Sequence, residues 1–162
     1  MSKKQTVSAN DAADWFLNRV DREAGESITH LALQKLLFFA QAWYLANKGE
    51  PLFPEDFEAW AHGPVIRSIW ERFRNNSWDS LSPPGGAKEI VGEPAELLEH
   101  VYEKYGQYGA KKLERLSHER GGPWEAARAG LPPEARCEKV IPKGEIRAFY
   151  GKKIGKKWKL GL

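Results

Sequence analysis

The sequence predicts a mainly α-helical fold: a compact single-domain helical bundle around one buried central helix, with a small β-hairpin beside it. The strongest observation is the segment Leu31 to Ala46, where 13 of 16 residues are apolar. A helix that is apolar on nearly every face must be covered by other elements, and Thr29 and Gly49 are placed to cap its two ends. Elsewhere apolar residues recur at helical spacing on one side only, and 162 residues suffice for one hydrophobic core.

The elements on either side of this helix follow from capping residues and from prolines. The first predicted helix runs from Ser8 to Glu23, because Ser8 and Asp11 resemble a capping box and apolar residues follow at helical spacing. After the central helix, residues 50–60 hold two prolines and show no helical period. We expect their two extended pieces, Leu52–Phe53 and Phe57–Trp60, to pair as a small hairpin.

Glycine and proline set the bounds of the later elements. Proline is favoured at the first position of a helix, and glycine often ends one. The stretch Ser77 to Glu93 holds three glycines and two prolines and is predicted to be a long surface loop. The remaining predicted helices are Pro64 to Asn75, Pro94 to Tyr105, Ala110 to Arg120, a short piece from Pro123, and a last helix from Pro142 through Tyr150.

Composition divides the chain into a flexible N-terminus (residues 1–7), one helical domain (residues 8–150) and a lysine-rich C-terminal tail (residues 151–162). Lys and Arg total 25 against 22 Asp and Glu, and five of the lysines follow Tyr150, so the residues before the tail are slightly acidic overall. A nucleic-acid-binding domain usually carries its own basic face, which disfavours that class for the helical domain. The tail lysines are Lys152, Lys153, Lys156, Lys157 and Lys159.

Several classes of protein are disfavoured by what the sequence lacks. The single cysteine, Cys137, gives no intramolecular disulfide framework, and no secretory signal opens the chain, so we expect a cytoplasmic protein. The central apolar segment is too short and too polar in its middle to cross a membrane, which takes about 20 apolar residues. The four histidines show no metal-ligand spacing and no phosphate-binding loop occurs, so no metal or cofactor is expected.

Ser117 and His118 are neighbours and suggest a nucleophile and a base. Adjacent residues on a helix point about 100° apart, and no third group that would orient the histidine is indicated. We therefore expect His118 to cap or pack around Pro123 and Trp124 and expect no enzyme. A hydrolase with a cryptic Ser/His site remains the weakest hypothesis.

Three stretches occur in order along the chain and resemble one known family. They resemble the Panacea antitoxin domain, which includes SocA-like antitoxins and phage-associated GepA proteins, over about residues 8–150. The stretches are LQKLLFFAQAWYL at Leu33–Leu45, FEAWAHGPV at Phe57–Val65, and a late element from Tyr108-Gly109 through Leu116-Ser117-His118 to Pro123-Trp124. The chain departs from the family at Ser117, where threonine is frequent, and in its lysine-rich end.

The resemblance implies an antitoxin of a type II toxin–antitoxin system, which neutralises a co-encoded toxin by direct protein–protein binding. In at least one branch of the family the antitoxin is also an adaptor that delivers its toxin to a AAA+ protease. Such a protein needs no cofactor. The alternative hypothesis is a phage-associated or regulatory factor that binds nucleic acid through the basic tail.

The residues that interrupt the central helix are candidates for toxin binding. Gln34, Lys35 and Gln41 share one sector of that helix with Phe38. They form either a rim or buried polar network that fixes the packing, or part of the toxin-binding face. Lys35→Glu separates the two interpretations, because only a residue on an exposed face tolerates that change without loss of stability.

Tryptophans and motif residues complete the candidates. Trp60 is either part of a structural corner or, if exposed, an interface hot spot. Trp78 in the predicted loop and Trp158 in the tail are recognition candidates, because their burial is least assured. The tail is either a solvated end or a contact for an acidic toxin surface or nucleic acid. We assign structural roles to the family-motif residues Gly63, Pro64, Val65, His118, Pro123 and Trp124.

Overall fold

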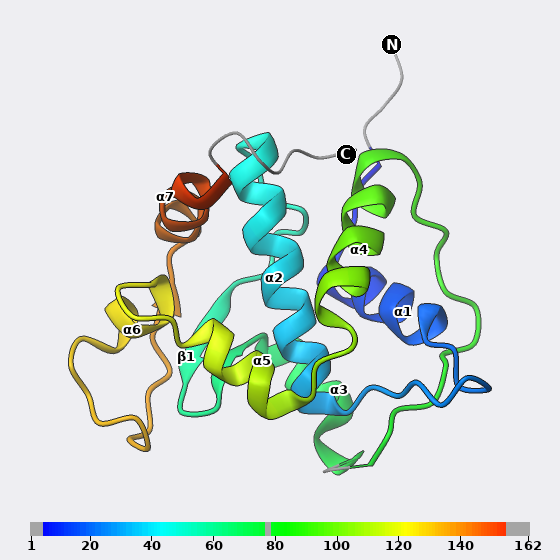
Figure 1. The fold of residues 1–162 in the computed structure, drawn as a ribbon, viewed down its shortest axis with the longest axis horizontal. Helices are drawn as coiled ribbons and strands as arrows, with labels where there is room; N and C mark the ends of the chain where they lie inside the picture. Colours follow the sequence, from blue (N-terminus) through cyan, green and yellow to red (C-terminus); the bar gives the residue numbers. More distant parts are fainter. Residues whose placement is uncertain (1–4, 77–78, 155–162) are drawn as a thin grey trace.

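The computed structural model of the chain describes residues 5–76 and 79–154 and confirms a mainly helical fold with a small sheet (Figure 1). In chain order the elements are α1 (Ala9–Arg19), α2 (His30–Lys48), β1 (Phe57–Trp60), β2 (Gly63–Val65), α3 (Arg67–Phe73), the 3-10 turn η1 (Arg74–Asn76), α4 (Gly92–Tyr105), α5 (Ala110–Ser117), α6 (Pro123–Arg128), β3 (Val140–Ile141) and α7 (Lys143–Ile154).

Helix α2 is the predicted central helix and runs through the middle of the molecule, with α7 on one side and α4 and α1 on the other (Figure 1). Every residue from Ala32 to Leu45 is buried, as the apolar pattern predicts. The Thr29 hydroxyl accepts a hydrogen bond from the backbone N–H of Ala32, and Gly49 ends the helix in the left-handed conformation with φ 74°. Both predicted caps are therefore confirmed.

Aromatic rings fix how α2 packs against its neighbours. Phe39 stacks on Tyr105 of α4 with ring centroids 4.3 Å apart, and Phe38 meets Phe57 of β1 edge to face at 5.3 Å. Trp43 meets Tyr150 of α7 edge to face at 5.0 Å. Because burying one such side chain stabilises the fold by about 1.5–3 kcal/mol, α2 holds much of the core together.

The predicted capping box at the first helix is confirmed. The Ser8 hydroxyl accepts from the N–H of Asp11, and the Asp11 carboxylate accepts from the N–H of Ser8. Helix α1 ends at Arg19, before the predicted end at Glu23, because Val20 is already extended. A two-sided cap of this kind satisfies two backbone donors that the first turn leaves unpaired.

The hairpin lies one segment later than predicted. Strand β1 pairs antiparallel with β2, with Trp60 opposite Gly63, and β3 pairs with the other edge of β1. The expectation of a strand at Leu52–Phe53 is wrong. The side chain of Gln41 takes up the Leu52 N–H and the Phe53 C=O, so no partner strand is needed there.

Pro64 lies in β2 and does not open a helix, which is the second correction in this region. Strand β2 is at the edge of the order β2-β1-β3, where a residue without an N–H is tolerated. Helix α3 begins instead at Arg67. Strand β3 was not predicted, because two residues are too short to give an alternating pattern.

The later helices begin close to the predicted residues, and α5 ends earlier. Helix α4 begins at Gly92, two residues before Pro94, and α7 follows Pro142 directly. Helix α5 ends at Ser117, because His118 closes it by donating its N–H to the carbonyls of Glu114 and Arg115. Among the described residues, the helices are all too short or too polar to cross a membrane.

Candidate functional site: a polar junction and an aromatic groove

Two glutamines of α2 hold the segment that carries the hairpin. Gln41 accepts from the N–H of Leu52 and donates to the carbonyl of Phe53, both at 2.7 Å. Gln34 accepts from the N–H of Ile66 at 2.9 Å and donates to its carbonyl at 3.3 Å. Both glutamine side chains are fully buried. They therefore fix the two ends of the hairpin segment to the central helix.

Lys35 lies between these two glutamines and touches the start of β2. It is 1% exposed, and its Nζ has no hydrogen-bond partner within residues 5–76 and 79–154. A Cβ on Gly63 would stand 2.6 Å from Lys35 Cε and 3.1 Å from the hydroxyl of Ser117. Desolvation lowers the pKa of Lys35 to about 8, and the nearby Glu114 opposes that shift.

The third family motif packs beside Lys35 and Gly63. The His118 ring stacks on Trp124 with centroids 3.5 Å apart, and the Trp124 indole N–H donates to the carbonyl of Trp60 at 2.8 Å. Burial lowers the pKa of His118 to about 4, helped by the positive charges of Lys35 and Arg128. The three motifs thus meet at one point. We call Lys35, Gly63, Ser117, His118 and Trp124 the motif junction.

The junction contains no catalytic arrangement of Ser117 and His118. The Ser117 hydroxyl donates to the carbonyl of Glu114 at 2.8 Å, one turn back in its own helix, while the His118 ring packs against Trp124. No group of three or more His, Cys, Asp or Glu residues that could hold a metal ion occurs in the part of the chain that the structure describes.

The structure places the predicted partner-binding residues of α2 inside the molecule. Gln34, Lys35, Phe38 and Gln41 are at most 1% exposed, so no partner reaches them while the core is closed. Their burial favours the polar-network interpretation over an exposed binding face. The other motif residues, Pro64, Val65 and Pro123, are buried too, Pro123 as the first residue of α6.

Of the three tryptophans predicted as recognition candidates, the structure describes only Trp60. Trp60 is half-buried and meets Trp70 edge to face at 5.3 Å in a hollow of about 430 Å³. The Arg67 guanidinium lies over the Trp60 ring and pairs with Glu58 and Glu138, so its positive charge is already balanced. Trp78 and Trp158, with Lys156, Lys157 and Lys159, lie outside the described residues.

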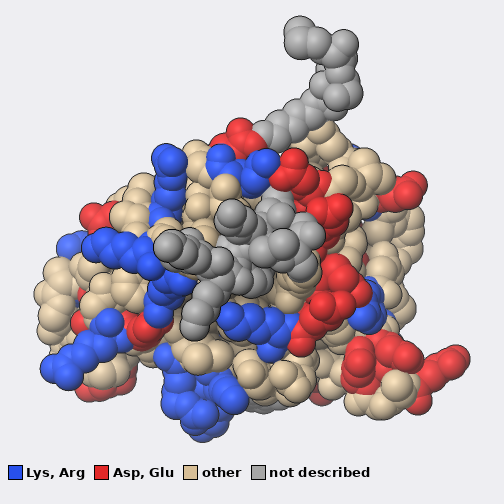
Figure 2. All heavy atoms as spheres, turned by 45° about the horizontal axis from the view of Figure 1, so that its top comes forward, with Lys and Arg blue, Asp and Glu red and all other residues tan. Residues whose placement is uncertain are grey.

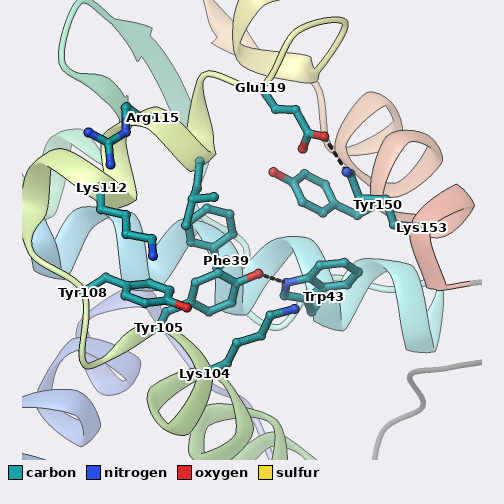
Figure 3. A pocket seen from close by; sticks show the side chains of 11 residues that line it. Phe39, Trp43, Lys104, Tyr105, Tyr108, Lys112, Arg115, Glu119, Tyr150 and Lys153 are labelled. Atoms are coloured by element: carbon teal, nitrogen blue, oxygen red, sulfur yellow. Dashed lines mark hydrogen bonds and ion pairs between the residues drawn. The ribbon is translucent and has the colours of Figure 1, made fainter.

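A larger hollow opens between α2, α4, α5 and α7, with a volume of about 680 Å³ (Figure 3). Its floor is aromatic: Phe39, Tyr105 and Tyr150 come from three different helices and are buried, and the half-buried Tyr108 extends the floor. The Tyr105 hydroxyl accepts a hydrogen bond from the Trp43 indole at 2.9 Å, which holds both side chains in place. We call this hollow the aromatic groove.

The rim of the aromatic groove is basic. Lys104, Lys112 and Arg115 are exposed and line it, and no ion pair joins any of the three to another residue that the structure describes. The ammonium groups of Lys104 and Lys112 lie over the rings of Tyr105 and Tyr108, at 5.3 Å and 3.8 Å from their centroids (Figure 3). The groove therefore presents three available positive charges above an apolar floor.

One end of the groove is closed by an ion pair. Lys153 of α7 contacts Glu119, which follows α5, at 2.6 Å (Figure 3). The predicted basic tail thus begins inside α7, since Lys152 and Lys153 both belong to that helix.

Charge is unevenly spread over the face in Figure 2, where Lys and Arg gather on the left and below and Asp and Glu mostly on the right.

Sequence reasoning did not single out the basic rim of the groove, and it named Tyr108 and Leu116 only through the family resemblance and Lys153 only as part of the tail. Lys104, Lys112 and Arg115 are ordinary surface charges in the sequence, and Tyr105 and Tyr108 fit a core pattern. One signal was available: Tyr108 and Lys112 are four residues apart across the start of α5. That spacing lets a lysine reach back over an aromatic ring.

The part of the chain that forms the junction matches a known family model. Residues 33–125 match the family model described as antitoxin SocA-like, Panacea domain, and this range contains every residue of the motif junction. The chain is 35% identical over 157 residues to Antitoxin SocA of Caulobacter vibrioides (strain NA1000 / CB15N), covering 85% of this chain and 81% of that protein. No solved structure matches. This chain belongs to the family of SocA-like antitoxins that carry the Panacea domain.

Proposed function

We propose that this protein is the antitoxin of a type II toxin–antitoxin pair and neutralises a co-encoded toxin by direct, stoichiometric binding. Membership of an antitoxin family supports the antitoxin role. The observation that carries direct binding is the aromatic groove, because an apolar floor inside a charged rim is the anatomy of a protein–protein interface. The motif junction then serves as the rigid support of that surface.

A growth assay tests the proposal. The genes next to the one for this chain are expressed singly from an inducible promoter, with and without this chain. We expect one of them to stop growth alone and to be tolerated when this chain is present. The two purified proteins should then form a complex of fixed stoichiometry by light scattering. A toxic neighbour that is not rescued, or is rescued without forming a complex, contradicts the proposal.

The same strains distinguish inhibition from delivery to a AAA+ protease. Inhibition leaves the toxin intact, so its half-life after translation is stopped should stay the same or lengthen when this chain is present. Delivery shortens that half-life and fails in a strain without the unfoldase. We place inhibition first, because the groove supplies a surface for the toxin and no second surface is needed.

The alternative is nucleic-acid binding through the tail. Of its five lysines, Lys153 already pairs with Glu119. A gel shift of the complete chain that disappears at high salt supports this alternative, and its absence at low salt removes it.

A further inference from the structure

We infer that the aromatic groove takes an acidic segment of the toxin that carries one large apolar side chain. This inference rests on the proposed function, because the segment belongs to the neutralised partner. The apolar side chain enters the hollow beside the rings of Phe39, Tyr105 and Tyr108, while flanking carboxylates meet Lys104, Lys112 and Arg115.

The charge of the groove selects an acidic partner. Lys104, Lys112 and Arg115 belong to α4 and α5 and surround one hollow, and their positive charges are not neutralised by any carboxylate in the described ranges. The carboxylate of Glu119, which also lines the hollow, is already bound to Lys153. An incoming carboxylate therefore meets three available cations and no available anion of the lining. Such complementarity sets partner choice and the rate of association.

The floor selects a large apolar side chain next to those carboxylates. Phe39 and Tyr105 stack on each other, and the hydrogen bond from Trp43 fixes Tyr105, so the floor does not collapse into the hollow. The hollow of about 680 Å³ has more than enough room for one aromatic or branched side chain. Buried aromatic anchors of this kind dominate the affinity of many interfaces.

The same chemistry of cations and aromatics also occurs in sites for single-stranded nucleic acid, and the geometry favours a protein. A base stacks on an open ring face. Here Tyr105 is stacked on Phe39, and the ammonium groups of Lys104 and Lys112 lie over the faces of Tyr105 and Tyr108. These ring faces are therefore covered and offer a base no place to stack, while the ammonium groups can still pair with carboxylates.

The chain's own C-terminal residues are a poorer match by charge. Residues 155–162 hold three lysines and no acidic residue, so they would add positive charge to a groove whose rim is already basic. A partner with carboxylates gains attraction where this segment gains repulsion.

Two synthetic peptides test the inference with the complete, purified chain. One is acetyl-Glu-Asp-Glu-Trp-Glu-Asp-Glu-amide, and the other replaces every Glu by Gln and every Asp by Asn. We expect the acidic peptide to bind at least about tenfold more tightly by calorimetry, with an affinity that falls as sodium chloride is raised. Equal affinities, or no binding of either peptide, overturn the inference.

A matched pair of double variants places the binding in the groove. Lys112→Glu with Arg115→Glu reverses two charges of the rim, whereas Lys111→Glu with Arg120→Glu reverses two exposed charges that do not line the hollow. Both pairs leave the core intact, which thermal unfolding checks. We expect the first pair to weaken the acidic peptide by at least about tenfold and the second by less than about threefold. Equal losses from the two pairs contradict the groove as the site.

Three further measurements identify other molecules or segments that could bind in the groove. Tighter binding of a labelled oligothymidylate than of the acidic peptide, lost in the Lys112→Glu, Arg115→Glu variant, makes the groove a nucleic-acid site and overturns the inference. A dimer of this chain that the same variant dissociates makes it an interface between copies. A chain ending at Ile154 that binds the acidic peptide at least about tenfold more tightly shows that residues 155–162 occupy the groove.

The growth assay separates this inference from the proposed function. If the unchanged chain rescues growth and the Lys112→Glu, Arg115→Glu variant rescues it equally well, the groove inference is wrong and the antitoxin proposal stands. If the unchanged chain does not rescue growth, the proposed function fails, whatever the peptides show. We expect rescue by the unchanged chain and by the Lys111→Glu, Arg120→Glu control, and loss of rescue in the groove variant.

Discussion

The side chain of Lys35 lies against the backbone of Gly63, so closely that a Cβ at position 63 would stand 2.6 Å from Lys35 Cε. This contact joins the central helix to the hairpin and brings the first two family motifs together. Ser117 completes it from the third motif, since its hydroxyl would be 3.1 Å from the same Cβ. The junction is therefore a point where three elements leave no room for another atom.

Gly63→Ala should destabilise the fold. The new methyl group would collide with Lys35 Cε and crowd the Ser117 hydroxyl, and the φ of 113° at Gly63 is unfavourable for any residue with a Cβ. We expect a loss of about 2–4 kcal/mol in the free energy of unfolding by urea denaturation. The matched control is Gly85→Ala, because a Cβ there meets nothing within 4 Å, and it should change the free energy by less than about 0.5 kcal/mol. Equal effects would mean that the contact does not constrain the fold.

Lys35→Met should stabilise the protein at neutral pH. The fold lowers the pKa of Lys35 to about 8, so between pH 8 and about 10.5 the unfolded chain binds the proton more strongly and stability rises with pH. Below pH 8 the buried charge costs about 1–3 kcal/mol, which methionine removes while keeping the apolar stem. The gain over the wild type should therefore shrink as the pH rises from 8 to 10.5. Lys111→Met, at an exposed site of α5, is the control and should change the free energy of unfolding by less than about 0.5 kcal/mol.

A gain that is constant with pH would contradict the buried charge as its cause. The same reasoning revises the expectation for Lys35→Glu. A carboxylate enclosed at this position would lose its hydration and would lie near the like charge of Glu114, so we expect that variant to unfold, which loss of far-ultraviolet circular dichroism would show.

Acid should destabilise the fold through two histidines, the buried His30 and the half-buried His118. Burial lowers the pKa of His30 and of His118 to about 4, against about 6.5 in the unfolded chain. Between those values the unfolded chain binds more protons, so stability is present above pH 6.5 and is lost as the pH falls towards 4. We expect a loss of about 1–2 kcal/mol for each histidine, after allowance for partial contact with solvent.

His118→Phe isolates the contribution of one of them. Phenylalanine keeps a flat ring against Trp124 and removes the Nε2 atom, which is buried without a hydrogen-bond partner among the described residues. Denaturation curves at several values between pH 4 and 7 should then show a smaller loss of stability than in the wild type. The control is Gln107→Met at an exposed position, which removes no ionisable group and should leave the pH dependence unchanged. If the stability of His118→Phe fell with pH just as that of the wild type does, His118 would not be a source of the acid sensitivity.

The sequence was informative where one short pattern decides the structure, and uninformative where distant segments meet. The caps at Ser8, Thr29 and Gly49 follow from local chemistry, and so does the near-complete burial of α2. That Gln41 would replace a partner strand for residues 52–53 depends on a contact eleven residues away, which no local pattern reveals. Arg128 shows the same limit, because it is buried and donates to the carbonyls of Ala59 and Ala135 although its sequence context is that of a surface residue.

The aromatic groove was out of reach for a related reason. Its lining comes from four helices and the loops beside α5, and each residue alone fits a more ordinary role. Amphipathic spacing identifies which side of a helix is apolar, but it does not say where four packed helices leave a hollow between them. By contrast, the buried position of Lys35 was one of two open interpretations, and the structure favours it because the side chain is 1% exposed and packs against Gly63.

Gln41→Met should be more damaging than its similar size suggests. The glutamine side chain is the hydrogen-bond partner of the Leu52 N–H and of the Phe53 carbonyl, both buried, and methionine offers neither a donor nor a strong acceptor. Two buried backbone groups would be left unsatisfied, which should cost about 2–4 kcal/mol of the free energy of unfolding. Amide hydrogen exchange adds a local readout, because the Leu52 N–H should lose its protection more than amides in the middle of α2 do. The exposed Gln107→Met is the control and should be neutral in both measurements. If Gln41→Met were equally neutral, the hairpin would be held by its apolar contacts alone, and the polar residues of α2 would need another explanation.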